Sequence, residues 1–264
     1  NIKDIDEPLL LWRSSSQWLG GLLFLLGTIG TIGSKQIKIK PAYLISGGAS
    51  GRNFYNNFNS NFIKILLIYS ISTILVIFLY TLVNIRLFDA FNLSFTTISA
   101  GGFLPTNDLT NIIFTNSQIF ILSFTLMIPI FNFFFLYDVI TNKFTLKKNQ
   151  EDLHLFLLII TLTLFVYFFI NNENKLIEIF FAFTTSFSTS GIFTNTSNLD
   201  LSLFFILITL VGGSLISVSS GYKYARFYIM LKISYQEIYR LAKPMNIIDK
   251  NLFKSGSKID DEDV

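Results

Sequence analysis

Two stretches of this sequence, residues 86–103 and 175–192, match without a gap when one is shifted by 89 positions. The shift pairs residues of the same chemical kind: Arg86 with Lys175, Asp89 with Glu178, Thr96 with Thr185, and Gly102 with Gly191. Each copy is a short apolar segment that runs into a pentad of mostly small residues: Ser99, Ala100, Gly101, Gly102 and Phe103 in the first, and Ser188, Thr189, Ser190, Gly191 and Ile192 in the second. The duplication predicts two copies of one structural unit.

The composition predicts an integral membrane protein. Of 264 residues, 51% are hydrophobic and only 14% are charged, whereas soluble domains average about 25% charged residues. The mean hydropathy is +0.54. The sequence contains no cysteine, which excludes disulfides and Cys-based metal sites. A net charge of +3 is too small to indicate nucleic-acid binding.

Five segments are long enough to cross a bilayer, which takes about 20 apolar residues. They are residues 17–33, 62–82, 117–139, 153–170 and 199–219. Pro129 predicts a kink in the third. Two further apolar segments, 87–97 and 176–187, have about half the spanning length and are expected to be re-entrant. The predicted fold class is all-α integral membrane, with repeated units of helix, pore helix, filter and helix.

The charged residues predict the orientation of these segments. Basic residues dominate the loop between the first two spans and the segment after the fifth, while the loop between spans three and four holds three lysines with Glu151 and Asp152. The positive-inside rule places these regions in the cytoplasm and both short helices on the outer side. After Lys223, apolar periodicity predicts a helix at the inner surface that ends at Lys243-Pro244, followed by an acidic tail.

The two pentads carry the predicted chemistry. Non-helical backbone at membrane depth must be buried in protein or line a watery cavity, and rings of main-chain carbonyl oxygens can replace the hydration shell of K⁺ or Na⁺. Gly102 and Gly191 would be essential to such a strand, because glycine adopts positive φ without steric cost. Two alternatives stay open: loops with a glycine turn, or the midplane site of a secondary transporter.

The fifth predicted span contains a second irregularity, a run rich in small residues: Gly212, Gly213, Ser214, Ser217, Ser219, Ser220 and Gly221. Each glycine costs roughly 1 kcal/mol relative to alanine within a helix. We therefore predict a break or loop within the membrane below the second pentad. The alternative is a face of small residues that packs against another helix.

The sequence offers no constellation of catalytic residues. His154 is the single histidine and has no cluster of carboxylates around it, and no phosphate-binding glycine loop or Ser/His/Asp set occurs. We expect a protein that is not an enzyme and has no cofactor, with K⁺ or Na⁺ at the filter residues as a transported ion.

Several motifs in combination resemble the membrane subunit of the Trk/Ktr/HKT potassium-uptake superfamily, over about residues 11–247. They are Trp12-Arg13-Ser14 with Gln17-Trp18-Leu19-Gly20-Gly21, the segments 95–103 and 188–191, and Gly212-Gly213 through Gly221-Tyr222-Lys223 with Arg226. The resemblance implies potassium uptake through a pseudo-fourfold pore of four helix–filter–helix repeats, with the loop 212–221 as a gate. It also implies a multi-pass protein of the bacterial inner membrane, in contact with lipid. The partners it implies are a second copy in a homodimer and a cytoplasmic nucleotide-binding subunit of the RCK type.

The same resemblance divides the chain into four parts. Residues 1–61 would be the second helix of a first repeat with a cytoplasmic loop, 62–152 and 153–222 two complete repeats, and 223–264 a cytoplasmic helix and acidic tail. The sequence begins with Asn and holds two of the four expected filter strands, which we interpret as a piece of a longer chain. In the gate-like segment, the family has smaller or more flexible residues at five positions, which are Leu215, Ile216, Val218, Ser219 and Ser220 here. A carrier of a small solute and a truncated, non-conducting subunit remain alternative functions.

Overall fold

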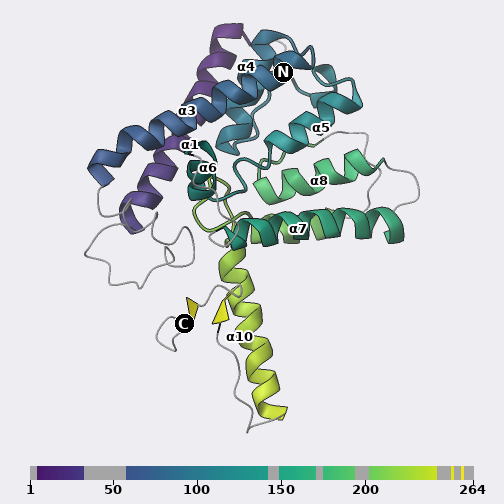
Figure 1. The fold of residues 1–264 in the computed structure, drawn as a ribbon. Helices are drawn as coiled ribbons and strands as arrows, with labels where there is room; N and C mark the ends of the chain where they lie inside the picture. The colour runs from purple at the N-terminus through teal and green to yellow at the C-terminus, as the bar shows by residue number, and fades with distance from the viewer. Residues whose placement is uncertain are drawn as a thin grey trace.

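The computed structural model describes residues 5–32, 58–141, 149–170, 175–193, 202–242, 251–252 and 257–258. Its α-helices are α1 (Glu7–Ile32), α3 (Phe58–Leu82), α4 (Leu87–Ser99), α5 (Asn116–Thr125), α6 (Phe133–Ile140), α7 (Gln150–Phe165), α8 (Leu176–Ser188), α9 (Ser202–Val211) and α10 (Tyr224–Ala242) (Figure 1). A 3₁₀ turn, η3 (Leu109–Asn111), precedes α5, and a π-helical turn, η4 (Val166–Ile170), extends α7. Two short strands, β1 (Asn251–Leu252) and β2 (Ser257–Lys258), pair antiparallel. Apart from this pair, the described residues form helices and the loops that join them.

Two helical stretches among the described residues are long and apolar enough to cross a membrane. They are Phe62–Leu82 within α3 and Gln150–Phe169 over α7 and η4, and both coincide with predicted spans. The side chains of Ile63, Ile74 and Phe78 on α3 are 60% exposed or more. A helix that exposes large apolar side chains in this way suits contact with lipid.

The other three predicted spans differ from the structure. The first corresponds to α1, which already begins at Glu7. The third is interrupted, because α5 ends at Thr125 and α6 begins at Phe133. Pro129 has no main-chain N–H and disfavours helical conformation in the preceding residue. The fifth ends early, because α9 stops at Val211 and the chain turns at Gly212, where φ is 69°.

The interruption of the third span has a local origin in the sequence. The Asn132 side chain accepts a hydrogen bond of 3.0 Å from the Phe134 amide and so caps the new helix α6. The predicted kink is therefore a complete break between two short helices. Neither α5 nor α6 has the length of a membrane span.

The two short helices α4 and α8 occupy equivalent positions in the duplicated sequence. Both contain 13 residues, and they correspond to the two predicted apolar segments of sub-spanning length. Helix α1 packs on α4, and α7 and α9 both pack on α8. Each short helix therefore packs against other helices of the molecule.

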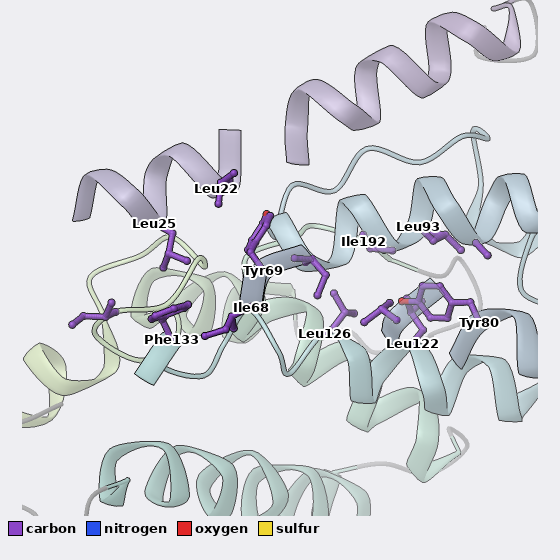
Figure 2. Packing of buried hydrophobic residues seen from close by; sticks show 14 of the residues in the cluster. Leu22, Leu25, Ile68, Tyr69, Tyr80, Leu93, Leu122, Leu126, Phe133 and Ile192 are labelled. Carbon is purple, nitrogen blue, oxygen red and sulfur yellow. The ribbon is translucent and has the colours of Figure 1, made fainter. Parts of the chain in front are cut away.

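Two apolar clusters form the core. The first joins α1, α3, α4 and α5, and it includes Ile192 from the second pentad (Figure 2). The second joins α7, α8 and α9 with Met127, Ile130 and Tyr224. Helix α5 packs against α8 and connects the two halves of the molecule.

Helix α10 extends away from the other helices (Figure 1). It ends at Ala242, immediately before the Lys243-Pro244 pair that predicts its end. Most of the first two basic loops and of the acidic tail lies outside the described residues. The predicted orientation of the chain therefore stays a prediction.

A buried tyrosine hydroxyl fastens α3 to its neighbours and provides a test of the packing. The Tyr80 hydroxyl lies 2.6 Å from Thr125 Oγ1 and 3.4 Å from Thr97 Oγ1, and the side chain is fully buried. Tyr80→Phe should cost about 1 kcal/mol, the net value of one hydrogen bond. The melting temperature in detergent should then fall by about 2 to 4 °C.

The matched control is Tyr235→Phe on α10, where the side chain is 67% exposed. Its melting temperature should equal that of the unmodified protein. Equal shifts in the two variants would contradict the packing of α3 described here.

Candidate functional site

The backbone of the two pentads has the same unusual conformation at equivalent positions. Helices α4 and α8 both end in a left-handed residue, Ala100 with φ of 54° and Thr189 with φ of 58°. Two residues later, Gly102 and Gly191 also have positive φ, of 84° and 66°. Positive φ at alternate positions takes the main chain of each pentad out of both helical and extended conformation.

This conformation is costly for a residue with a side chain. A left-handed conformation costs roughly 1–2 kcal/mol per non-glycine residue, and Thr189 is in addition β-branched. Strain that the surrounding structure maintains is a feature of functional sites. Its repetition at equivalent positions marks both pentads as candidate site segments.

The structure brings the two pentads into contact. The main-chain carbonyl oxygen of Ser190 lies directly against Gly102, so that a Cβ atom at position 102 would collide with it and lie 3.2 Å from its carbonyl carbon. Nothing lies within 4 Å of a Cβ placed at Gly191. The predicted need for glycine is therefore steric and conformational at Gly102, and conformational only at Gly191.

Helix α1 packs against the first pentad. The Gln17 side chain lies against Gly101, where a Cβ would collide with it, and Gln17 Oε1 lies 3.2 Å from the Thr96 hydroxyl. The Thr96 hydroxyl also donates to the carbonyl oxygen of Phe103. In the sequence, Gln17 stands out only as part of a family motif. Its contact with Gly101 is a tertiary one, and no local signal predicts it.

A second residue of α1 holds the end of the same pentad. The Arg13 guanidinium donates to the carbonyl oxygen of Leu104, and its centre lies 5.0 Å from the centre of the Phe103 ring. A guanidinium over an aromatic face is a favourable contact. Arg13, like Gln17, was not predicted as a site residue.

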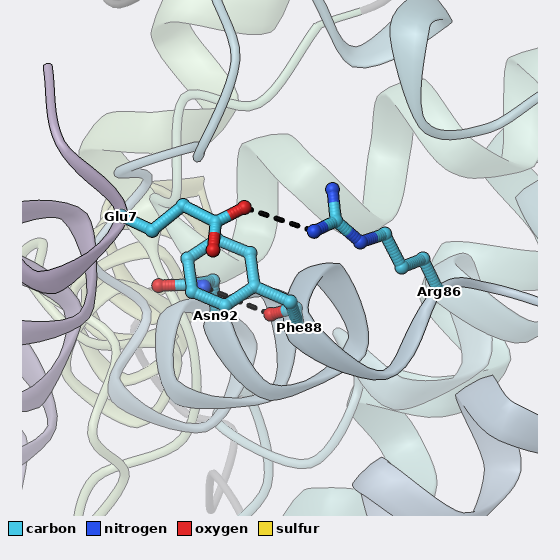
Figure 3. Close-up of polar contacts among 4 residues, drawn as sticks. All are labelled: Glu7, Arg86, Phe88 and Asn92. Carbon is cyan, nitrogen blue, oxygen red and sulfur yellow. Dashed lines mark hydrogen bonds and ion pairs between the residues drawn. The ribbon is translucent and has the colours of Figure 1, made fainter.

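Further contacts fasten α1 to α4 on the same side. The Ser14 hydroxyl donates to Asn92 Oδ1 at 2.6 Å. Asn92 Nδ2 in turn donates to the carbonyl oxygen of Phe88, as Figure 3 shows. Figure 3 also shows the ion pair of 2.9 Å between Arg86 and Glu7. Both charged side chains are more than half exposed, so this pair contributes little to stability. The buried Ser14–Asn92 contact is the more important of the two.

The second pentad is hydrogen bonded to the broken part of the fifth predicted span. The hydroxyl oxygen of Thr189 accepts bonds of 2.9 Å from both the main-chain N–H and the hydroxyl of Ser220. It also donates to the carbonyl oxygen of Ser188 at 2.6 Å. The left-handed residue that ends α8 is therefore connected to the segment 212–223, which we call the intervening loop.

The intervening loop contains every residue of the predicted gate segment, and it is not helical. Gly212 and Gly221, with φ of 69° and 96°, face each other at its base, and a Cβ at Gly212 would lie 3.2 Å from the Cα of Gly221. Gly213 donates its main-chain N–H to the Ser219 hydroxyl at 3.1 Å, and the Ser217 and Ser219 hydroxyls lie 2.9 Å apart. The predicted break in this span is confirmed, and small residues are required where the two ends of the loop meet.

The two helix breaks pair with each other. Ser214 N–H donates to the carbonyl oxygen of Ile130 at 2.8 Å, Ser219 N–H to that of Pro129 at 3.1 Å, and Phe133 N–H to that of Ile216 at 2.8 Å. Buried main-chain groups must find partners when a helix is interrupted. Each break supplies the partners that the other lacks.

Two adjacent carboxylates from the first turn of α7 complete this pairing. Glu151 Oε1 accepts from the Leu215 N–H and Asp152 Oδ1 from the Asn132 N–H, both at 2.8 Å. Both side chains are buried, each with 3% exposure. They lie in the first turn of α7 and not in the loop in which they were predicted, while their predicted cytoplasmic side stays a prediction. Adjacent acidic residues at the start of an apolar helix are the signal that could have identified them.

The cation-binding groups that this region offers are main-chain and hydroxyl oxygens. In the described part of the chain no three His, Asp or Glu side chains gather as a metal site would require. His154 instead contacts the Tyr224 hydroxyl. Ser188 Oγ donates to Ser190 Oγ at 3.0 Å, so the hydroxyls of the second pentad are partly engaged with one another.

Comparison with known proteins agrees with this architecture. No protein-family model matches the sequence. An uncharacterized cation transporter of Methanocaldococcus jannaschii is 26% identical over 259 residues, which cover 94% of this chain and 52% of that protein. The crystal structure of the potassium transporter TrkH from Vibrio parahaemolyticus superposes with a TM-score of 0.73 and 18% identity.

This chain has the fold of TrkH. The superposition covers 98% of the chain and 55% of TrkH, so the chain spans about half the length of the proteins it matches. The fold of this similar protein agrees with the all-helical fold expected from the motifs.

Proposed function

We propose that this protein transports potassium ions, and that main-chain carbonyl oxygens of residues 99–103 and 188–192 coordinate the ion. One observation carries the proposal: two strained, glycine-containing pentads with the same backbone conformation touch each other at Gly102 and Ser190. Carbonyl oxygens presented in this way can replace the water around a monovalent cation.

The two similar proteins support transport over catalysis. One is named as a cation transporter and the other as a potassium transporter. We propose the same class of function here, in a multi-pass membrane protein, with α4 and α8 as pore helices within the units 62–152 and 153–222. A complete ion path would need further filter strands beyond the two described.

The assembly implied by the family remains part of the proposal. It comprises a homodimer in the bacterial inner membrane and an RCK-type nucleotide-binding subunit at the cytoplasmic face. Helix α10 would be available to such a subunit, because it extends away from the other helices (Figure 1). Chemical cross-linking of α10 to a co-purified subunit would test this arrangement.

The test of transport is uptake of radioactive Rb⁺ by liposomes that contain the full-length protein. We expect uptake that K⁺ competes for more strongly than Na⁺, and that amino acids do not affect. Competition by an organic solute would indicate a carrier instead. Absence of any Rb⁺ uptake by folded protein would support a non-conducting subunit.

A further inference from the structure

The intervening loop holds a positive charge that belongs to the protein itself. The Lys223 ammonium donates to the carbonyl oxygen and the hydroxyl of Ser217, both at 3.1 Å, and to the carbonyl oxygen of Ser219. Lys223 is 8% exposed, and Ser217 and Ser219 are more deeply buried still. The ring of Phe24 on α1 lies 5.9 Å from the ammonium nitrogen.

These groups form a ligand set for a monovalent cation. A lysine ammonium has three N–H donors and no acceptor, and the three oxygens satisfy all three donors. Neutral main-chain and hydroxyl oxygens are also the ligands that replace water around K⁺, which is close in size to an ammonium group. The aromatic face of Phe24 attracts either cation.

A buried carboxylate that contacts the same loop favours a positive charge there. Glu151 Oε1 accepts the Leu215 N–H, but Glu151 Oε2 is buried and has no hydrogen-bond partner among the described residues. Glu151 and Lys223 both bond to the intervening loop, Glu151 at Leu215 and Lys223 at Ser217 and Ser219. A buried carboxylate oxygen without a partner is costly unless a nearby positive charge compensates it.

We propose that the oxygens of Ser217 and Ser219 form a monovalent-cation site that the Lys223 ammonium fills as a tethered ion. The Thr189–Ser220 hydrogen bonds connect this site to the second pentad. Without the ammonium, a mobile cation of the size of K⁺ or Rb⁺ takes its place. The inference rests on the proposed function in one respect, since a mobile cation must be able to reach the loop.

The experiment counts bound Rb⁺ by equilibrium dialysis of the full-length protein in detergent. Lys223→Met removes the charge at similar side-chain length and should add one Rb⁺ per chain to the number bound by the unmodified protein. Lys223→Arg should leave the number unchanged. Adding Ser217→Ala to Lys223→Met removes one ligand and should weaken binding to the extra site at least tenfold.

The matched control is Lys232→Met, the same substitution on α10, at a residue that does not bond to the oxygens of Ser217 and Ser219. It should leave the number of bound ions unchanged. A folded Lys223→Met protein that binds no additional Rb⁺ overturns the proposal. So does an extra ion whose affinity is the same with and without the Ser217 hydroxyl.

A stability measurement covers the case in which Lys223→Met folds poorly. Rb⁺ or K⁺ in place of choline should then raise the melting temperature of Lys223→Met more than that of the unmodified protein, because the ion replaces the missing ammonium. An equal response of the two proteins overturns the proposal. Failure of the proposed function would appear separately, as absent Rb⁺ uptake by the unmodified protein in liposomes.

Discussion

Replacing Gly102 by alanine is expected to reduce K⁺-selective Rb⁺ uptake at least tenfold and to weaken discrimination against Na⁺. A Cβ at this position would collide with the Ser190 carbonyl oxygen, and φ of 84° is unfavourable for alanine. The conformational cost alone is roughly 1–2 kcal/mol, which corresponds to about a tenfold change in an equilibrium. The collision adds to this cost by moving one of the proposed coordinating oxygens. The measurement is Rb⁺ uptake by liposomes with K⁺ or Na⁺ as competitor.

The duplicated unit supplies its own matched control. Gly191→Ala carries the conformational cost but meets no neighbouring atom within 4 Å, so its effect on selectivity should be clearly smaller. Gly20→Ala on α1 carries no conformational cost and meets no neighbouring atom within 4 Å. This variant should behave as the unmodified protein. Equal losses in Gly102→Ala and Gly191→Ala would show that the contact between the pentads does not set the coordination geometry.

Removing the carboxylate of Asp152 is expected to destabilise the protein and to loosen the intervening loop. In Asp152→Ala the buried Asn132 N–H loses its acceptor, and a buried group left unsatisfied costs about 1–3 kcal/mol. Asp152→Asn keeps an oxygen that can accept the same bond, so most of the stability should remain. Glu151→Ala should act similarly through the Leu215 N–H. Thermal unfolding in detergent measures each effect.

Two further variants are compared with Asp152→Ala. Glu7→Ala removes a carboxylate from an exposed ion pair and should cost less than about 1 kcal/mol. The double variant of Glu151 and Asp152 should be less destabilised than the sum of the two single variants, because both carboxylates stabilise the same paired breaks. If Asp152→Asn is as unstable as Asp152→Ala, the charge matters and the hydrogen bond does not.

The main-chain hydrogen bonds between the two helix breaks, one between α5 and α6 and one after α9, explain why the breaks occur together. Main-chain groups of residues 214, 216 and 219 bond to those of residues 129, 130 and 133. Either break alone would leave buried donors and acceptors without partners. The loop that is predicted as a gate is therefore hydrogen bonded to three parts of the structure: the break between α5 and α6, helix α7 and Thr189.

The short helices were predictable because their signals are local. The segments 87–97 and 176–187 were expected to be short helices, and they coincide closely with α4 and α8. Gly102 and Gly191 were identified through the shift of 89 positions, and both have positive φ. Continuity of the third span was not predictable, since a proline in an apolar segment can kink a helix or end it.

The amino-acid sequence by itself determined where the two short helices and the duplicated pentads lie and which glycines have positive φ, because these properties depend on neighbours within a few residues. The tertiary structure alone decided the partners of Glu151, Asp152 and Lys223. Glu151 meets a main-chain N–H 64 positions away, and the Lys223 ammonium is held by carbonyl oxygens of a loop. Main-chain donors and acceptors are the same at every residue, so only the folded geometry selects which of them a buried charge will bind.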